Sequence, residues 1–473
     1  MTLRQVAAVV GGEVAPAGGD DVVVSGPATL DSREVEPGGL FVAIAGERVD
    51  GHAFAEAAAA AGAAAAIGSR PTALPTVVVP DATVALGRLA RHVRDELARR
   101  GALTVLAMTG SQGKTGTKDH LAHVLASVGE TVATRGNLNN ELGVPLTVLR
   151  ADERTRWLVV EMGARGVGHV AELCAVARPD AAAVLNVGSA HLGEFGSREA
   201  IAQAKGEIVE TLGADGTAVL NAADPLVAPM AARTAARVLT FGPASSGAAV
   251  TYDDVVLDDL ARAAFTLGAA GESHRVALRQ VGPHQVPNAA AAAALAVAGG
   301  VPLAAVATAL ATSEAASRRR MEVTERADGT VVLDDCYNAN PESMAAALDT
   351  LRLVGERRGA RRVAVLGDML ELGSGEVEEH RALGRAAAAA GVDLLVTVGP
   401  LAAHAAAAYT ESRGHRGETV LTAGRDEAAA RVGENVAAGD VVLVKASRGV
   451  ALEHVVAALA HDRPGEQQEE TVR

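Results

Sequence analysis

The sequence predicts an α/β protein of three domains, with mainly parallel sheets in the larger two. Its 473 residues would fill two to four domains at about 100–200 residues each. Short apolar stretches alternate with longer stretches of helical spacing, which is typical of parallel sheets covered by helices on both faces. We predict a small α/β domain at 1–100, a central domain at 101–315, a Rossmann-like domain at 316–461 and a disordered tail at 462–473.

The composition excludes two broad classes of protein. Hydrophobic residues make up 49% of the chain, which argues against intrinsic disorder. The net charge is −14 and aromatic residues make up only 2%, whereas nucleic-acid binding needs a basic groove with aromatic stacking platforms. We therefore expect a folded protein with no nucleic-acid partner. A small phosphorylated ligand remains possible because it needs only a local positive site.

Three features predict a cytoplasmic location. Cys174 and Cys336 are the two cysteines and lie far apart, so no disulfide framework is expected. The long alanine-rich stretch at 289–311 is interrupted by Gly299, Gly300 and Pro302, which favours two helices over a membrane span. The first eleven residues show no signal-peptide pattern.

The predicted elements follow from apolar periodicity. In the first domain we expect strands at 22–24, 40–44 and 76–79 and helices at 54–66 and 84–100. In the central domain we expect strands at 103–108, 157–160, 181–185 and 218–220, an antiparallel segment at 250–278 and two helices within 289–311. In the third domain we expect strands at 330–333, 362–366, 394–398 and 441–444.

A glycine-rich loop joins the strand at 103–108 to a helix and is the strongest local signal. Its residues are Gly110, Ser111, Gln112, Gly113, Lys114 and Thr115. Such a loop directs backbone N–H groups and a helix dipole at a phosphate, and its lysine and hydroxyl can serve phosphate and Mg²⁺. The position of the first glycine of a full P-loop is occupied by Met108. An ordinary strand–helix turn is the alternative, but the context favours nucleotide binding.

Polar residues follow several other predicted strands of the central domain. Glu161 closes the strand at 157–160, where a carboxylate beside a phosphate loop could hold Mg²⁺. Taken alone, His191 reads as a structural histidine, Lys205 as a surface lysine and Asn288 as a helix cap.

The third domain repeats this pattern of polar strand ends. Arg320 ends a basic cluster, and the loop from Asp335 through Asn338 and Asn340 is denser in polar groups than a turn requires. The last predicted strand is followed by a cationic loop suited to an anionic ligand, with Lys445, Ser447 and Arg448.

Together these segments resemble the Mur ligase family, and the resemblance covers nearly the whole chain. It is carried by residues 31–38, 40–44, 50–52, 110–115, 136–145, 161–164, 190–197, 204–207, 335–341, 367–373 and 445–448. The segments at 137–145, 335–341 and 367–373 point to the member that adds D-alanyl-D-alanine. Two positions depart from the family pattern: Gln112 replaces the frequent Asn or Ser, and Gly116 replaces the usual Thr or Ser. Gly116 removes one possible hydroxyl from the phosphate site.

The resemblance implies roles for the residues of the central domain. Lys114 would hold the β- and γ-phosphates of ATP within the 110–116 loop, and Thr115 with Glu161 would bind one Mg²⁺. His191 would bind a second Mg²⁺, and Lys205 matches the family lysine that CO₂ carbamylates.

The resemblance also implies binding residues in all three domains. ATP would be contacted by Asn288, Arg320, Asp335, Asn338 and Asn340. The UDP end of the substrate would meet Ser32 and Arg33, and the muramoyl-peptide would meet Asn139 and Asn140. Lys445, Ser447 and Arg448 would complete the cleft near the dipeptide carboxylate.

The implied activity joins D-alanyl-D-alanine to UDP-N-acetylmuramoyl-tripeptide, with ATP and Mg²⁺, in a monomeric cytoplasmic enzyme of peptidoglycan synthesis. The γ-phosphoryl group would activate the tripeptide carboxylate as an acyl phosphate, and closure of the second and third domains would exclude water. Alternatives are a related ligase that adds a single amino acid, such as a sibling ligase or a folylpolyglutamate synthase-like enzyme, a nucleotide-dependent switch, and a P-loop kinase. The kinase leaves the third domain unexplained.

Overall fold

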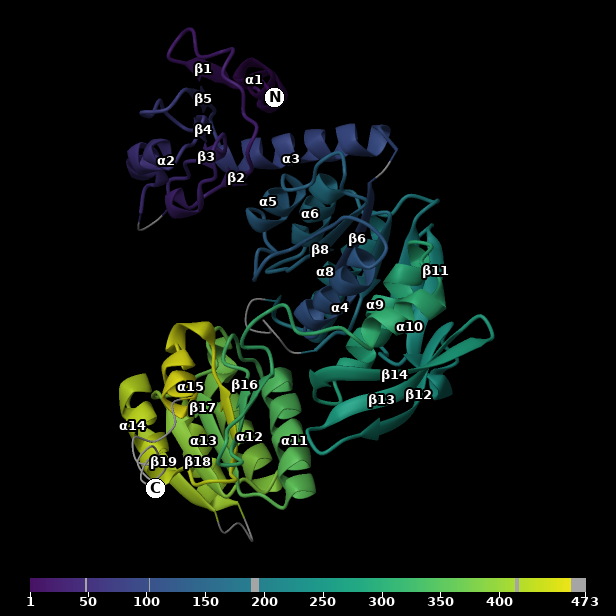
Figure 1. Cartoon of the computed structure of the whole chain (residues 1–473), viewed down its shortest axis with the longest axis vertical. Coiled ribbons are helices and arrows are strands. Elements are labelled where there is room, and N and C mark those ends of the chain that lie inside the picture. The colour runs from purple at the N-terminus through teal and green to yellow at the C-terminus, as the bar shows by residue number, and fades with distance from the viewer. Residues whose placement is uncertain (47–48, 102, 189–194, 413–416, 461–473) are drawn as a thin grey trace, which may run out of the picture.

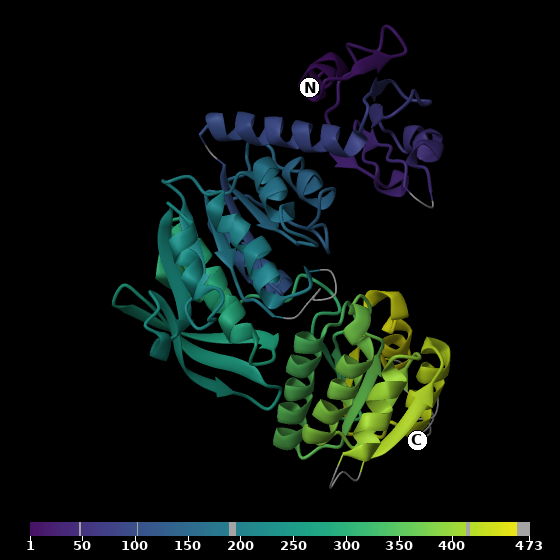
Figure 2. The same cartoon turned by 180° about the vertical axis from the view of Figure 1, so that it is seen from behind.

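The computed structural model describes residues 1–46, 49–101, 103–188, 195–412 and 417–460. These residues form three α/β units that follow one another along the chain, each with its own sheet (Figure 1 and Figure 2). The three-domain α/β class predicted from the sequence is confirmed, whereas the exact boundaries stay predictions. The predicted tail at 462–473 lies outside the described residues. No helix in the described part of the chain has the length and apolarity needed to cross a membrane.

The first unit is a five-stranded sheet in the order β1-β5-β4-β3-β2. Its strands are β1 (Glu13–Ala15), β2 (Ala28–Thr29), β3 (Leu40–Val42), β4 (Ala65–Gly68) and β5 (Thr76–Val78). β1 is antiparallel to β5 and the other pairs are parallel. The helices are α1 (Leu3–Val10), α2 (Ala55–Ala60) and α3 (Ala82–Arg99).

Two predictions for this unit are wrong. Residues 22–24 form no strand, because Val23 makes only an isolated bridge with Thr2. The predicted helix at 54–66 ends at Ala60, and 65–68 become the middle strand β4. Gly62 adopts a left-handed φ of 102° that breaks the helix. Alanine has high helix propensity, so the sequence around β4 gives no local sign of the sheet that buries it.

The central sheet has nine strands in the order β14-β13-β12-β11-β10-β9-β6-β8-β7. The strands from β7 to β12 in that order are parallel, and β12, β13 and β14 form an antiparallel edge, as predicted for 250–278. Their bounds are β6 (Thr104–Thr109), β7 (Thr131–Ala133), β8 (Trp157–Glu161), β9 (Ala181–Val184), β10 (Thr217–Asn221), β11 (Arg237–Pro243), β12 (Val250–Leu257), β13 (Arg262–Ala269) and β14 (Glu272–Val281).

Helices cover both faces of this sheet. One apolar core lies under α4 (Lys114–Ala126), α9 (Gln285–Ala298) and α10 (Leu303–Leu310). The opposite core lies under α5 (Gly143–Val148), α6 (His169–Ala177) and α8 (Arg198–Glu210). α9 and α10 confirm the two helices predicted within 289–311.

The third sheet has six strands in the order β15-β16-β20-β17-β18-β19, and only the β15–β16 pair is antiparallel. The strands are β15 (Glu322–Glu325), β16 (Val331–Asp334), β17 (Arg362–Gly367), β18 (Leu394–Val398), β19 (Glu418–Thr422) and β20 (Val441–Lys445). The four predicted strands became the buried interior of the sheet. Edge strands β15 and β19 were missed because they are short and, apart from Thr422, exposed or only partly buried, so neither shows a continuous apolar stretch. The helices are α11 (Pro341–Arg358), α12 (Glu376–Ala389), α13 (Ala402–Glu411), α14 (Arg425–Asn435) and α15 (Glu453–Ala460).

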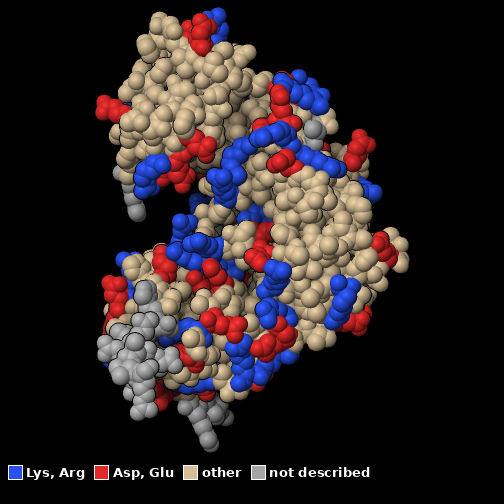
Figure 3. Space-filling model, in the orientation of Figure 1, with Lys and Arg blue, Asp and Glu red and all other residues tan. Residues whose placement is uncertain are grey.

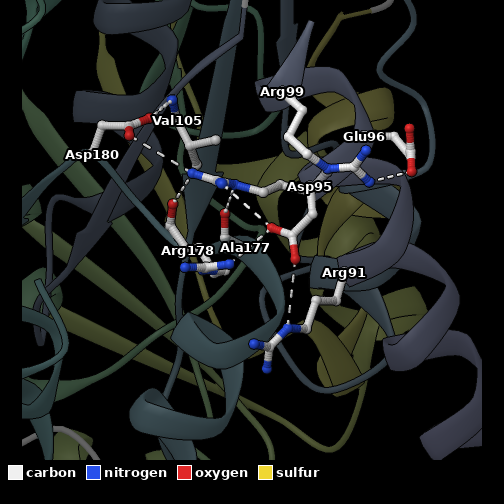
Figure 4. A network of polar contacts seen from close by, with 9 residues as sticks. Arg91, Asp95, Glu96, Arg99, Val105, Ala177, Arg178 and Asp180 are labelled. Atoms are coloured by element: carbon white, nitrogen blue, oxygen red, sulfur yellow. Dashed lines mark hydrogen bonds and ion pairs between the residues drawn. The ribbon is translucent and has the colours of Figure 1, made fainter. Parts of the chain in front are cut away.

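α3 joins the first unit to the central one through shared apolar cores and a buried arginine. Leu97 of α3 belongs to the central core, and Leu146 of α5 belongs to the core of the first unit. The Arg94 side chain is only 10% exposed. Its Nε donates to the Ala177 carbonyl at 3.2 Å and its Nη2 to the Arg178 carbonyl at 2.6 Å, which caps the end of α6. Figure 4 shows this network, with Asp95 and Asp180 beside the guanidinium.

Replacing Arg94 should weaken the central domain. In Arg94→Met the two carbonyls lose their donor and the two carboxylates lose a partly buried counter-charge. We expect the free energy of unfolding to fall by about 2–4 kcal/mol. Urea unfolding followed by the fluorescence of Trp157, the one tryptophan and a residue of β8, measures this change. The control is Arg99→Met on the same helix, whose pair with Glu96 is exposed, so its loss should change stability far less. Equal effects of the two substitutions would contradict the assignment.

Candidate active site

The carboxyl ends of the central and third sheets face one another across a cleft. The cleft encloses about 950 Å³ and is lined by loops that follow β6, β8, β9, β16, β17 and β20. Figure 3 shows basic side chains around the hollow between the units. Parallel strands end at a common edge, so this placement brings distant loops together.

The phosphate loop forms one wall of the cleft. α4 begins at Lys114 after Gly113, and no side chain of the described residues caps this helix end. The first N–H groups of a helix have no intrahelical acceptor and carry the positive end of its dipole, so they can bind an anion. Gly113 has a left-handed φ of 79°, which explains the glycine. Lys114 Nζ donates to the Gly110 carbonyl at 2.6 Å, so the loop lysine already folds over the loop.

Asn186, which the sequence reasoning missed, holds the phosphate loop in shape. Its Oδ1 accepts from the backbone N–H of Ser111 at 3.1 Å and of Gln112 at 3.0 Å, and its Nδ2 donates to the Gln112 carbonyl at 3.1 Å. The sequence did contain a sign of this role, because Asn186 is the first polar residue after the buried strand β9. Its partner lies more than 70 positions away, which no local pattern reveals.

Asn288 does not cap α9, as its isolated interpretation suggested, but faces the phosphate loop from the first turn of that helix. A Cβ at Gly116 would lie 2.9 Å from Asn288 Nδ2, and one at Gly113 would lie 2.4 Å from Asn288 Oδ1. The Asn288 amide therefore lies beside the space that a side chain at 116 would enter. Its Nδ2 also donates to Gln285 Oε1 at 3.1 Å.

Glu161 and Thr115 form the part of the cleft that fits a magnesium ion. Thr115 Oγ1 donates to Glu161 Oε2 at 3.1 Å, and Asn139 Nδ2 donates to Glu161 Oε1 at 2.8 Å. Glu161 is only 2% exposed. The described residues contain no group of three or more His, Cys, Asp or Glu side chains that could enclose a metal. One carboxylate and one hydroxyl beside a phosphate loop suit Mg²⁺, which keeps several waters and shares substrate phosphates. His191 lies outside the described residues.

Lys205 is buried on α8 at 4% exposure, so its interpretation as a surface lysine is wrong. Burial and the nearby charge of Lys114 lower the pKa of Lys205 well below its usual range. Burial also lowers the pKa of Lys114, which Glu161 opposes and Arg320 reinforces. Lys114 therefore lies close enough to both Lys205 and Arg320 for the positive charges to act on one another.

The third unit supplies the opposite wall. Lys445 Nζ donates to Asp335 Oδ2 at 2.5 Å and to the Asn338 carbonyl at 2.9 Å. Two guanidinium groups pack against the Tyr337 ring, with Arg320 Cζ 4.2 Å and Arg448 Cζ 5.3 Å from its centroid. Arg448 Nη1 also reaches Asn137 Oδ1 of the central unit at 3.4 Å.

The structure brings most predicted site residues to this one cleft. They are Ser111, Gln112, Gly113, Lys114, Thr115, Gly116, Asn139, Asn140, Glu161, Lys205, Asn288, Arg320, Asp335, Asn338, Asn340, Lys445, Ser447 and Arg448. Ser32 and Arg33 lie outside it, in a short 3₁₀ turn of the first unit where Arg33 pairs with Asp31 at 2.6 Å. Asn140 and Asn340 also have local partners, since Asn140 Oδ1 accepts from Gly143 N at 3.0 Å and Asn340 caps α11.

A buried polar group supports α4 behind the phosphate loop. The His120 ring is fully buried, and its Nδ1 lies 3.1 Å from Ser313 Oγ. Burial lowers the pKa of His120 to about 4, although Asp119 opposes the shift. The imidazole is therefore neutral at physiological pH.

Taken together, the loop, the uncapped helix and the cationic groups on the two walls are typical of nucleotide-binding α/β enzymes with a site in a cleft between two sheets. The chain belongs to the Mur ligase family. Its residues 28–105 match the family's catalytic-domain description, 108–296 match the Mur ligase middle domain, and 319–448 match the Mur ligase glutamate ligase domain. Members of this family are ATP-dependent ligases, and this chain is an enzyme of that class.

Individual relatives extend the similarity over the full chain. The UDP-N-acetylmuramoyl-tripeptide–D-alanyl-D-alanine ligase of Mycobacterium tuberculosis is 44% identical, with 98% of each chain covered. A crystal structure of MurF from Acinetobacter baumannii has a TM-score of 0.84 at 33% identity and covers 97% of this chain and 98% of that one. The MurF ligase of Thermotoga maritima in complex with ADP has a TM-score of 0.77 at 31% identity, covering 92% and 97%.

The buried imidazole of His120 should make the protein sensitive to mild acid. The unfolded chain binds a proton at the ordinary pKa of about 6.5, whereas the folded chain resists it until about pH 4. Stability is thus fully present above pH 6.5 and falls as the pH drops to 4, by about 3 kcal/mol in total. We expect His120→Gln to flatten this part of the profile of unfolding free energy against pH.

The control for this prediction is Ser313→Ala, which removes the hydrogen-bond partner but keeps the imidazole, so the acid sensitivity should remain. An unchanged loss of stability between pH 6.5 and 4 in His120→Gln would show that another group is responsible.

Proposed function

We propose that the protein joins D-alanyl-D-alanine to UDP-N-acetylmuramoyl-tripeptide, with conversion of ATP to ADP and phosphate, in the synthesis of peptidoglycan precursors. The observation that carries this proposal is the 44% identity to a ligase of that name over 98% of both chains. The cleft supports it, because it combines a phosphate loop with cationic groups from two domains.

The phosphate loop would hold the nucleotide. The free N–H groups at the start of α4 and Lys114 would bind the β- and γ-phosphates, and Asn186 would keep the loop open for them. Arg320 would approach the phosphates, and the Asp335–Asn340 loop would meet the ribose and base. The complex of the Thermotoga maritima relative with ADP supports nucleotide binding in this fold.

The reaction would proceed in two steps. An oxygen of the terminal tripeptide carboxylate attacks the γ-phosphorus, the bond to the β-phosphate oxygen breaks, and an acyl phosphate and ADP result. The free amine of D-alanyl-D-alanine then attacks the acyl carbon, loses a proton and expels phosphate to leave an amide. Lys114 and Arg320 would stabilise the negative charge that accumulates when carboxylate and phosphate approach each other.

Two parts of the cleft suit a bound magnesium ion and a carbamate on a lysine. Thr115 and Glu161 would hold one Mg²⁺, which supplies charge neutralisation at the phosphates; His191 is proposed for a second ion. Lys205 would carry a carbamate, formed when its neutral amine nitrogen bonds to the carbon of CO₂ and releases a proton. The lowered pKa of Lys205 favours the neutral amine that this reaction needs.

The remaining roles concern the substrates and the state of the enzyme. Ser32 and Arg33 would bind the UDP end, Asn139 and Asn140 would face the muramoyl-peptide, and Lys445, Ser447 and Arg448 would face the dipeptide carboxylate. Action as a monomer is part of the same proposal. The nucleotide-linked substrate and ATP support a cytoplasmic location.

The proposed reaction is tested by phosphate release from ATP. We expect release to require both UDP-N-acetylmuramoyl-tripeptide and D-alanyl-D-alanine, with a product heavier than the tripeptide by the dipeptide less one water. Release with the nucleotide sugar and a single amino acid, but not with the dipeptide, would contradict the acceptor and keep the ligase class. ATP binding with no release under any combination would favour a nucleotide-dependent switch.

The carbamate at Lys205 is tested with labelled bicarbonate. The chain has only four lysines, at 114, 118, 205 and 445, so few amines can give a signal. In ¹³C-bicarbonate we expect one carbamate resonance that is absent from Lys205→Met. Ligase activity should fall when CO₂ is removed and return when bicarbonate is added. Lys205→Arg keeps a cation but cannot form the carbamate, and should be as inactive as Lys205→Met. Full activity of either variant without a bicarbonate response would contradict this role.

A further inference from the structure

One buried ion pair next to the active site has no part in the reaction proposed above. Lys118 Nζ lies 2.7 Å from Asp119 Oδ1 on α4, and their side chains are 5% and 6% exposed. The other three lysines of the chain all line the cleft. Burying two charges is unfavourable unless further hydrogen bonds satisfy both. The other hydrogen-bond partners of Lys118 and Asp119 therefore indicate which part of the chain this pair fixes in place.

Those partners converge on one residue of the linker between the central and third units. The backbone N–H of Ser317 donates to Asp119 Oδ2 and its hydroxyl donates to Asp119 Oδ1, each at 3.1 Å. Lys118 Nζ donates to Ser317 Oγ at 3.1 Å and to the Thr134 carbonyl at 3.2 Å. Ser317 is thereby fixed to the second turn of the helix that carries the phosphate loop.

The linker is fixed again four residues later, by the third unit. The Met321 N–H donates to Asp335 Oδ1 at 3.1 Å, and Asp335 is itself paired with Lys445. Between these two attachments the chain makes a strained turn, since Arg319 and Met321 have left-handed φ values of 60° and 57°. Left-handed conformations of residues other than glycine persist only where the surroundings impose them.

Arg320 lies at the centre of this turn. Its guanidinium stacks on Tyr337 at 4.2 Å from the ring centroid and lines the cleft. It lies close enough to Lys114 to add to the lowering of the Lys114 pKa by burial. If the turn were attached at only one end, the backbone would not fix the direction in which the Arg320 side chain points.

We propose that Lys118, Asp119 and Ser317 form a clasp that ties the phosphate-loop helix to the interdomain linker and thereby aims Arg320 at the nucleotide phosphates. The three are positioning residues, because they act through Arg320 and do not touch the substrate. This inference rests on the proposed nucleotide role of Arg320 and adds the device that directs it.

A double-mutant cycle separates positioning from general stabilisation. The affinity for Mg-ATP is measured by calorimetry for the wild type, Ser317→Ala, Arg320→Ala and the double variant. Ser317→Ala should weaken binding by about tenfold, as expected for lost hydrogen bonds to charged groups. If Ser317 acts through Arg320, the double variant should bind within about twofold of Arg320→Ala. Ser317→Thr, which keeps the hydroxyl, should bind as the wild type does.

The same helix and linker provide a matched control. His123 Nε2 lies 3.0 Å from Thr312 Oγ1 on the exposed side of the contact, so His123→Ala should change the affinity less than about twofold. Asp119→Asn is a second variant of the clasp and should reproduce Ser317→Ala. The clasp would be contradicted if the double variant lost affinity by the product of the two single fold-changes. It would also be contradicted if both Ser317→Ala and Asp119→Asn bound Mg-ATP with wild-type affinity. Wild-type affinity in Arg320→Ala would overturn it together with the nucleotide role of Arg320. Because binding is measured without turnover, these outcomes are independent of whether the ligase reaction occurs.

Discussion

Several cations are confined in one cleft, and the arrangement of the other site residues depends on this unfavourable gathering of positive charge. Burial lowers the pKa of both Lys114 and Lys205, and a neighbouring charge adds to it: Arg320 at Lys114, and Lys114 at Lys205. Glu161 is the carboxylate that opposes this effect at Lys114. Such a cluster is unfavourable by itself and becomes favourable when a polyanion with its metal ion binds. The cleft is thus most stable in the presence of the ligand for which we propose it.

The distribution of lysine follows the same constraint. The chain has 39 arginines but only four lysines, three of which line the cleft while the fourth lies directly behind it. Arginine stays charged in any surroundings, and its fork pairs with carboxylates, as in the exposed pair of Arg99 with Glu96. A lysine ammonium is compact and its pKa shifts readily on burial, so it can act as a point charge toward phosphate or as a neutral amine. Selection of lysine at these few positions is consistent with chemistry that arginine cannot supply.

Much of this site could be predicted from local motifs. The remaining features depend on packing between segments far apart in the sequence, which local motifs do not reveal. The phosphate loop and Glu161 were predicted because a strand, a polar loop and a helix follow one another within a few residues. The burial of Lys205 was not predictable, since α8 carries its buried face only in the context of α6 and β9. Likewise, the Asn288 amide that lies beside Gly113 and Gly116 comes from a helix some 170 positions later. In the first unit the alanine-rich β4 was mistaken for helix because alanine has no branched side chain that would favour a strand.

The contacts between the central and third units constrain how the cleft can close. On one side, Leu260 and Ala261 from the β12–β13 turn are buried in the core of the third unit, and Arg357 donates to the Leu257 carbonyl at 2.7 Å. On the other side, the exposed Arg448–Asn137 contact at 3.4 Å is long and open to water. Separating the buried contact would expose apolar surface, whereas separating the exposed one costs little. A change in the width of the cleft would therefore pivot about the β12–β13 turn. The Ser317–Met321 linker runs between the same two units, so the aim of Arg320 and the degree of closure would change together.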